Sequence, residues 1–137
     1  MNLLVLIASV RDQAKVERIF RENKIETVFH SAAHKHVPLL ETSPEEAIKN
    51  NVFGTWNVAT AAKNNNAEKF IFISTDKACN PTSVMAASKR LSEMVVEMIG
   101  HENKQMDFMA VRFGNVIGST GSVIPLFKDQ IKKGGPV

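Results

Sequence analysis

The chain has 137 residues, 44% of them hydrophobic, which is enough for one domain with an apolar core. Its 17 basic and 14 acidic residues leave a net charge of only +3, and the lysines are scattered along the chain. Because there is no basic stripe interleaved with aromatic residues, we do not expect nucleic acid as a partner. A mildly positive cleft would still suit a phosphorylated ligand.

The single cysteine, Cys79, excludes an internal disulfide, and the four histidines form no zinc-binding pattern with it. We therefore expect no metal and a reducing, cytoplasmic setting. The apolar opening over residues 1–10 lacks the flanks of a secretion signal and is far shorter than the ~20 residues that span a bilayer. We expect any membrane tether to lie in segments outside this chain.

Short apolar runs alternate with amphipathic segments, which is the pattern of an α/β fold with a parallel sheet flanked by helices. Each run is too continuously apolar for a strand with one wet face. The runs predicted as strands are Leu3–Ala8, Thr27–Ala32, Lys69–Ser74 and Phe108–Phe113.

The first two predicted helices carry clear start signals. Asp12 can cap a helix that ends near Asn23. The second helix should run from Ser43 to about Lys63, because a capping serine, a proline and a glutamate placed for a capping box follow one another there. Gly54 lies inside this helix at a cost of ~1 kcal/mol relative to alanine, so we expect it to pack closely against a neighbouring element.

A third helix is predicted over residues 83–99, ending at Gly100, and a fourth from about Ser122 to the glycine pair at 134–135. None of the seven glycines precedes Gly54. A Rossmann domain normally holds a dinucleotide pyrophosphate on a glycine-rich turn after its first strand. We therefore interpret residues 1–137 as a partial Rossmann domain truncated at both ends, without the N-terminal glycine-rich segment and the C-terminal substrate region, and expect it to be inactive alone.

Polar residues follow the second predicted strand, at the edge where parallel sheets collect their functional groups. Ala32 and Ala33 are small enough for the backbone to approach a flat cofactor, and His34, Lys35 and His36 can hold phosphate or carboxylate. A metal site is disfavoured because no further ligand has suitable spacing. Solvated loop histidines remain the simpler interpretation.

The third predicted strand ends in Ser74 and continues into Thr75, Asp76 and Lys77, a run of hydroxyl, carboxyl and amino groups. In the helix that follows, Met85 and Lys89 are four residues apart and share one face. Spacing alone favours a simpler alternative, in which the acid and the first lysine form an exposed ion pair, the methionine fills the core and the second lysine is a surface charge. The segment Gly114–Gly118, which includes Asn115, follows the fourth strand.

Three long stretches carry a family resemblance. They are VFHSAAHKHVPLLETSPEEAIKNNVFGTWNVA, KFIFISTDKACNPTSVMAASKRLSE and AVRFGNVIGSTGSVIPLFKDQIKKGGPV. They resemble the extended short-chain dehydrogenase/reductase superfamily and, within it, the UDP-N-acetylglucosamine 4,6-dehydratases of the polysaccharide-biosynthesis branch. The resemblance covers nearly the whole chain and implies NAD as cofactor, a UDP-sugar substrate and a homo-oligomer.

The resemblance also implies roles for individual residues. Cofactor-contacting or supporting positions are Ala32, Ala33, Asn51, Ser74 and Lys89, and substrate-contacting positions are His34, Lys35 and Asn115. The usual catalytic tyrosine, four residues before the lysine, is replaced by Met85, and the chain has no tyrosine. Ser9 stands where many relatives have an adenine-contacting aspartate.

The implied reaction oxidises the sugar at C4, eliminates water across C5 and C6, and returns the hydride at C6. We assign Lys77 as the base at C5, Asp76 as the acid for the departing hydroxyl, and Thr75 as the group that bonds the C4 hydroxyl. Two alternatives stay open: an epimerase or reductase on the same scaffold, and a catalytically silent NAD-binding module. The adjacent acid and lysine favour elimination.

Overall fold

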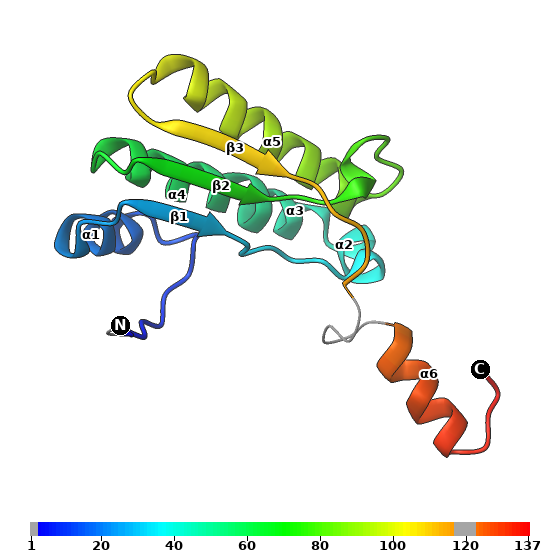
Figure 1. The fold of residues 1–137 in the computed structure, drawn as a ribbon. Helices are drawn as coiled ribbons and strands as arrows, with labels where there is room; N and C mark the ends of the chain where they lie inside the picture. The colour runs from blue at the N-terminus through cyan, green and yellow to red at the C-terminus, as the bar shows by residue number, and fades with distance from the viewer. Residues whose placement is uncertain (1–2, 117–122) are drawn as a thin grey trace.

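The fold is built on a small parallel sheet. A computed structural model describes residues 3–116 and 123–137. Its sheet has the order β1-β2-β3, formed by β1 (Thr27–His30), β2 (Lys69–Ile73) and β3 (Asp107–Val111) (Figure 1). Both pairings are parallel, with His30 beside Phe72 and Phe72 beside Ala110. This confirms the predicted α/β class and three of the four predicted strands.

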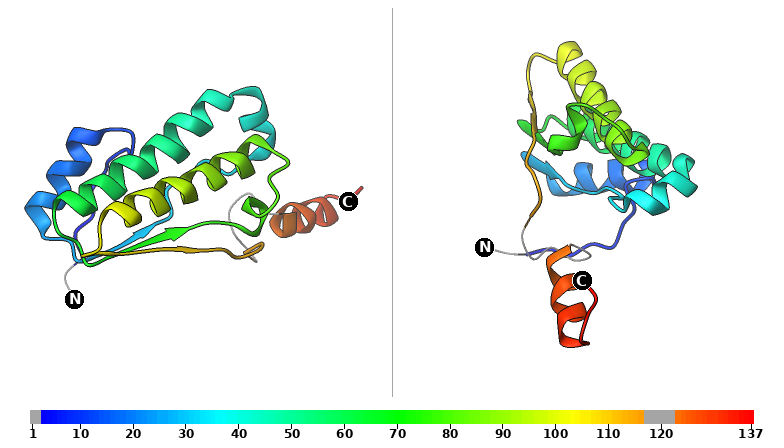
Figure 2. Two further views of the ribbon diagram at one scale, coloured as in Figure 1. Left: turned by 90° about the horizontal axis from the view of Figure 1, so that it is seen from above. Right: turned by 90° about the vertical axis from the view of Figure 1, so that its right-hand side faces the viewer.

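Helices connect the strands and lie over one face of the sheet. Figure 2 shows α1, α4 and α5 on the same side of the strands, and α6 beyond their carboxyl ends. The helical elements are α1 (Gln13–Asn23), α2 (Val37–Thr42), α3 (Pro44–Ala47), the π-helical η1 (Ile48–Phe53), α4 (Gly54–Asn64), the short 3-10 turn η2 (Asp76–Ala78), α5 (Val84–Glu102) and α6 (Val123–Lys132). Within the described ranges, no helix is long and apolar enough to cross a membrane.

The predicted cap of α1 forms, a cap of α5 forms that was not predicted, and the predicted capping box of α3 does not form. The Asp12 carboxylate accepts a hydrogen bond from the Lys15 amide at 3.0 Å, and Ser83 caps α5 through the Ala86 amide at 3.2 Å. The predicted capping box at Ser43 is wrong, because this side chain makes no cap hydrogen bond. The glutamate expected to complete it, Glu46, is drawn instead into ion pairs with Arg11 and Lys49.

The predicted second helix is present as α3, η1 and α4, with a π-helical middle that sequence periodicity does not reveal. Gly54 is the first residue of α4 and packs directly against Val10. A Cβ atom at Gly54 would lie 2.6 Å from Val10 Cγ2, which confirms the expected close packing. Gly100, by contrast, does not end its helix, because α5 continues to Glu102.

The first predicted strand is absent. Residues 3–8 have no regular secondary structure, and Leu3 and Ile7 are 84% and 91% exposed. An apolar run becomes a strand only where neighbouring backbone supplies hydrogen bonds, and β1, β2 and β3 pair only with one another among the described residues. In doubly wound sheets, strands that are consecutive in sequence can be separated by others, so this run need not lie beside β1.

The predicted strands end earlier than expected. The strands end at His30, Ile73 and Val111, so the last two residues of the runs Thr27–Ala32 and Phe108–Phe113 lie outside them. Beyond β2, the Ser74 amide still donates to the Val111 carbonyl at 2.8 Å, and the Asp76 amide to the Phe113 carbonyl at 3.2 Å. These departing segments build the site described below. Ile117, Gly118 and the expected helix start at Ser122 lie outside the described residues.

The core lies between the sheet and the three helices that cover it. Phe70 and Phe72 of β2 are at most 1% exposed, and their rings lie 5.8 Å from the His30 ring. Residues from α1, α4 and α5 complete this core, including Val16, Phe20, Val58, Val96 and Ile99. The opposite face of the sheet carries exposed apolar side chains, among them Phe29 and Met109, so the expectation that no strand has a solvent-exposed face is not met among the described residues.

The contact between Gly54 and Val10 gives a stability test. In an unobstructed helix, glycine to alanine stabilises by ~1 kcal/mol, but here the new methyl group must displace a stiff β-branched side chain. We expect Gly54→Ala to lower the free energy of unfolding in urea by ~1–3 kcal/mol, and Val10→Ala in the same chain to restore part of the loss. A stabilising Gly54→Ala would show that the contact imposes no constraint.

Candidate active site

A cavity of about 660 Å³ opens at the carboxyl edge of the sheet, where all three strands end. Each strand contributes to it through the segment that follows. The predicted site residues that line it are Ala33, His34 and Lys35 after β1, Ser74, Thr75 and Lys77 after β2, Met85 and Lys89 on α5, and Asn115 after β3. The tertiary fold thus brings together groups that are up to 82 residues apart in the sequence, from Ala33 to Asn115.

Three predicted residues lie outside the cavity lining. Ala32 is exposed in the loop after β1. Asp76 lies at the rim, where it contacts Lys77. Asn51 is buried behind the loop.

A hydrogen-bonded chain forms the rim of the cavity. The Lys77 ammonium donates to Asp76 Oδ1 at 3.0 Å and to Asn115 Oδ1 at 3.1 Å, and the Thr75 hydroxyl donates to Asp76 Oδ1 at 2.9 Å. The hydrogen bonds from Lys77 and then from Thr75 hold the pKa of Asp76 below its ordinary value. Because the Asp76 and Lys77 side chains are 55% and 46% exposed, this ion pair contributes little to stability.

Lys89 is the buried cation of the site. Only 7% of the residue is exposed, its ammonium donates to the Ile73 carbonyl at 2.6 Å, and it lies 4.1 Å from the centre of the Phe72 ring. Burial lowers its pKa to about 8, against the opposing effect of the Glu93 carboxylate. The interpretation of Lys89 as a surface charge is therefore wrong.

Met85 contacts both an apolar cluster and the cavity. It is 8% exposed and packs with Leu40 and Ala47 in a small apolar cluster, and it also borders the cavity. Its role as a core residue and its place in the site are therefore compatible. The thioether supplies an apolar wall beside Lys89.

Asn51 fixes the loop that follows β1. Its side-chain carbonyl accepts from the His34 amide at 2.7 Å, and its amide donates to the His34 carbonyl at 3.0 Å and to Ser88 Oγ at 2.9 Å. Its backbone carbonyl accepts from Thr55 and Ser92 hydroxyls at 2.6 and 2.7 Å. Asn51 lies in the π-helical η1, and such widened turns are frequent at functional sites.

Sequence reasoning missed a buried histidine. His30 is 4% exposed and its Nε2 lies 2.9 Å from Thr55 Oγ1. Burial, with a smaller effect of Lys89, lowers the pKa of His30 to about 4, so the ring is neutral at pH 7. Its position as the last residue of β1, directly before the site loop, was the available signal.

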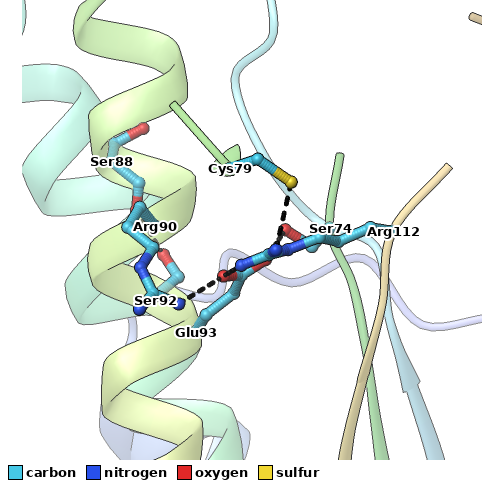
Figure 3. Close-up of polar contacts among 7 residues, drawn as sticks. All are labelled: Ser74, Cys79, Ser88, Arg90, Ser92, Glu93 and Arg112. Atoms are coloured by element: carbon cyan, nitrogen blue, oxygen red, sulfur yellow. Dashed lines mark hydrogen bonds and ion pairs between the residues drawn. The ribbon is translucent and has the colours of Figure 1, made fainter. Parts of the chain in front are cut away.

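A second missed group centres on Glu93. The Glu93 carboxylate accepts hydrogen bonds from Arg112, Ser74 and Arg90, and Arg112 also reaches Cys79 (Figure 3). The signal was present in the sequence, because Glu93 continues the four-residue spacing of Met85 and Lys89 along the same helical face. Within residues 3–116 and 123–137, no group of three or more histidine, cysteine or acidic residues is placed to hold a metal ion.

The chain matches a known family along its entire length. Residues 1–137 match the family described as polysaccharide biosynthesis protein. The capsular polysaccharide biosynthesis protein CapD of Staphylococcus aureus is 54% identical, over 100% of this chain and 23% of that protein. A UDP-N-acetylglucosamine 4,6-dehydratase (inverting) of Campylobacter jejuni is 42% identical, over 93% of this chain and 38% of that protein. A UDP-glucose 4-epimerase of Rickettsia rickettsii is also 42% identical, over 97% of this chain and 39% of that protein.

Solved structures agree with this assignment. Pen from Bacillus thuringiensis superposes with a TM-score of 0.88 at 41% identity, over 93% of this chain and 40% of that one. The UDP-glucose 4-epimerase of Thermus thermophilus, solved with NAD, gives a TM-score of 0.83 at 28% identity, over 95% of this chain and 49% of that one. The chain spans less than half the length of each of these proteins. With its Rossmann-type sheet and a site at the carboxyl ends of the strands, it belongs to the polysaccharide biosynthesis protein family, within the extended short-chain dehydrogenase/reductases.

Proposed function

We propose that the protein is an NAD-dependent nucleotide-sugar 4,6-dehydratase, which converts a UDP-N-acetylhexosamine to a 4-keto-6-deoxy sugar for surface polysaccharide. The observation that carries the proposal is the contact between Asp76 and Lys77, 3.0 Å apart at the rim of the cavity that contains Lys89. Elimination of water needs a base and an acid within reach of adjacent carbons, and this pair supplies both.

The donor set at the cavity fits NAD. When bound, NAD accepts a hydride from sugar C4 and returns it at C6. Lys89 has three donor hydrogens and uses one on the Ile73 carbonyl, which leaves donors for the ribose hydroxyls. The exposed loop at Ala33 offers little steric hindrance to a flat ring, and Lys35 and His34 supply donors for the diphosphate of the UDP-sugar.

Thr75 and Asp76 account for the proton released at C4. The Thr75 hydroxyl donates to Asp76 at 2.9 Å, so it can accept the C4 hydroxyl proton while passing its own to the carboxylate. The lowered pKa of Asp76 keeps its carboxylate ionised before substrate binds. Asp76 then holds the proton that the C6 hydroxyl needs to depart as water.

Lys77 is the proposed base at C5. Oxidation at C4 makes the C5 proton acidic, because the resulting carbanion is conjugated with the new carbonyl. Once Asp76 carries a proton, Lys77 loses its ionic partner, and a substrate that excludes water favours the neutral amine. Asn115, 3.1 Å from the Lys77 ammonium, can hold the amine in place through this change.

A 4-epimerase is the second candidate, because a relative at 42% identity is named UDP-glucose 4-epimerase. The two reactions differ in the mass of the product. We expect incubation of the intact enzyme with UDP-N-acetylglucosamine and NAD to give a product that has lost one water, identified by mass spectrometry. A product of unchanged mass and inverted C4 configuration would establish the epimerase instead.

Lys77→Met tests the base at C5. The variant should lower the rate at which the C5 proton exchanges with solvent deuterium by ~10²–10⁴-fold, while oxidation at C4 continues and reduced cofactor accumulates. Lys69→Met is the matched control, because Lys69 is exposed at the amino end of β2, at the opposite edge of the sheet. Normal exchange in Lys77→Met would remove this lysine from the mechanism.

Substitutions at Met85 and Thr75 distinguish a residue that acts through its shape from one that transfers a proton. Met85→Leu preserves approximate volume and apolarity, so we expect most of the activity to remain. Thr75→Val removes the hydroxyl between C4 and Asp76, and we expect a loss of ~10²–10⁴-fold in kcat with unchanged NAD binding. Equal loss in both folded variants would assign Met85 a chemical role.

A further inference from the structure

Glu93 is a buried carboxylate that the proposed reaction does not use. It is 6% exposed and lies on α5, one helical turn beyond Lys89. The Arg112 guanidinium donates to both of its oxygens, through Nε at 2.8 Å and Nη2 at 2.6 Å. This two-pronged contact fixes the orientation as well as the distance of the two side chains.

The contacts of this pair bracket the Thr75–Lys77 turn. Ser74, immediately before the turn, donates its hydroxyl to Glu93 Oε1 at 2.5 Å. Cys79, immediately after η2, accepts from Arg112 Nη1 at 3.1 Å, and its amide closes the turn on the Asp76 carbonyl at 3.1 Å. Figure 3 shows the Glu93 and Arg112 side chains meeting between α5 and the strand ends, beside Ser74 and Cys79.

The hydrogen bonds to Glu93 keep its carboxylate in the ionised state. Burial alone would raise the pKa of Glu93, but hydrogen bonds, first from Arg112 and then from Ser74, outweigh it and lower the pKa to about 2. Glu93 is therefore ionised throughout the neutral range. Glu93 is buried, whereas the Arg112 side chain is 37% exposed. An ion pair that is partly open to water contributes little net stability, so stability alone does not account for a pair with these particular contacts.

We propose that Glu93 and Arg112 are positioning residues that hold both ends of the Thr75–Lys77 turn at a fixed place relative to Lys89. The inference rests on the proposed function for its catalytic meaning, since the turn carries the acid and the base. The pair does not reach the cavity lining and acts through Ser74 and Cys79. α5 thus contributes Lys89 to the site directly. Through Glu93, which follows Lys89 by one helical turn, the same helix also aligns the Thr75–Lys77 segment.

Two variants and one control test the pair in the intact enzyme. Glu93→Gln removes the charge and places an amide donor against the guanidinium, and Arg112→Lys keeps the charge but loses the two-pronged contact. The control is Glu97→Gln, one turn further along α5, where the side chain is 65% exposed. We expect hydrogen–deuterium exchange over residues 74–79 to accelerate by about tenfold in both variants and to stay unchanged in the control.

The kinetic expectation separates positioning from binding. In both variants kcat should fall by about 10- to 100-fold, while KM for the nucleotide sugar and the bound NAD content change by less than about threefold. In a Lys77→Met background, Glu93→Gln should slow C5 deuterium exchange no further, because the group being aligned is already gone.

The outcomes are distinguishable from failure of the proposed function. If the unmodified enzyme performs no dehydration, the proposed function is wrong, and the exchange measurement still tests the pair. If exchange over residues 74–79 matches the Glu97→Gln control, or accelerates equally throughout the chain, the positioning role is overturned. If Glu93→Gln does not fold, Ser74→Ala removes one contact at the same turn, and unchanged exchange there also overturns it.

Discussion

Parallel pairing of β2 with both of its neighbours is the constraint on which the rest of this molecule depends. Strands that run in the same direction must end at the same edge, so the segments after His30, Ile73 and Val111 leave the sheet side by side. The cavity forms from these three departures. A site assembled in this way needs no single long loop, because the sheet itself supplies the relative positions.

The second organising feature is the helix that crosses behind this edge. α5 carries Met85, Lys89 and Glu93 on one face, and each meets a different environment: an apolar cluster, an aromatic ring with a backbone carbonyl, and a guanidinium. Glu93 lies one turn from Lys89 and carries the opposite charge, and its carboxylate opposes the lowering of the Lys89 pKa by burial. The face that anchors the helix to the core is thus also the face that sets the electrostatics of the site.

The rim and the interior of the site differ in rigidity. Asp76 and Lys77 form an exposed pair whose contact is weak in water and can rearrange when substrate binds. Lys89, Asn51 and Glu93 are buried and hydrogen-bonded, so their positions are set before any ligand arrives. This division suits the proposed reaction, in which protons would move at the rim while the cofactor and sugar stay in place.

The sequence by itself determined the α/β class, three strands, the cap of α1, the start of α5, and the grouping of Thr75, Lys77, Lys89 and Asn115 at one edge, because these follow from local sequence patterns and from the rule for parallel strands. Only the tertiary structure decided that Leu3–Ala8 is unpaired and that η1 is π-helical. It also decided that Lys89 is buried and that Glu93 meets Arg112. Spacing places residues on a face, but burial and pairing depend on which distant segments pack against that face, and that information is not local.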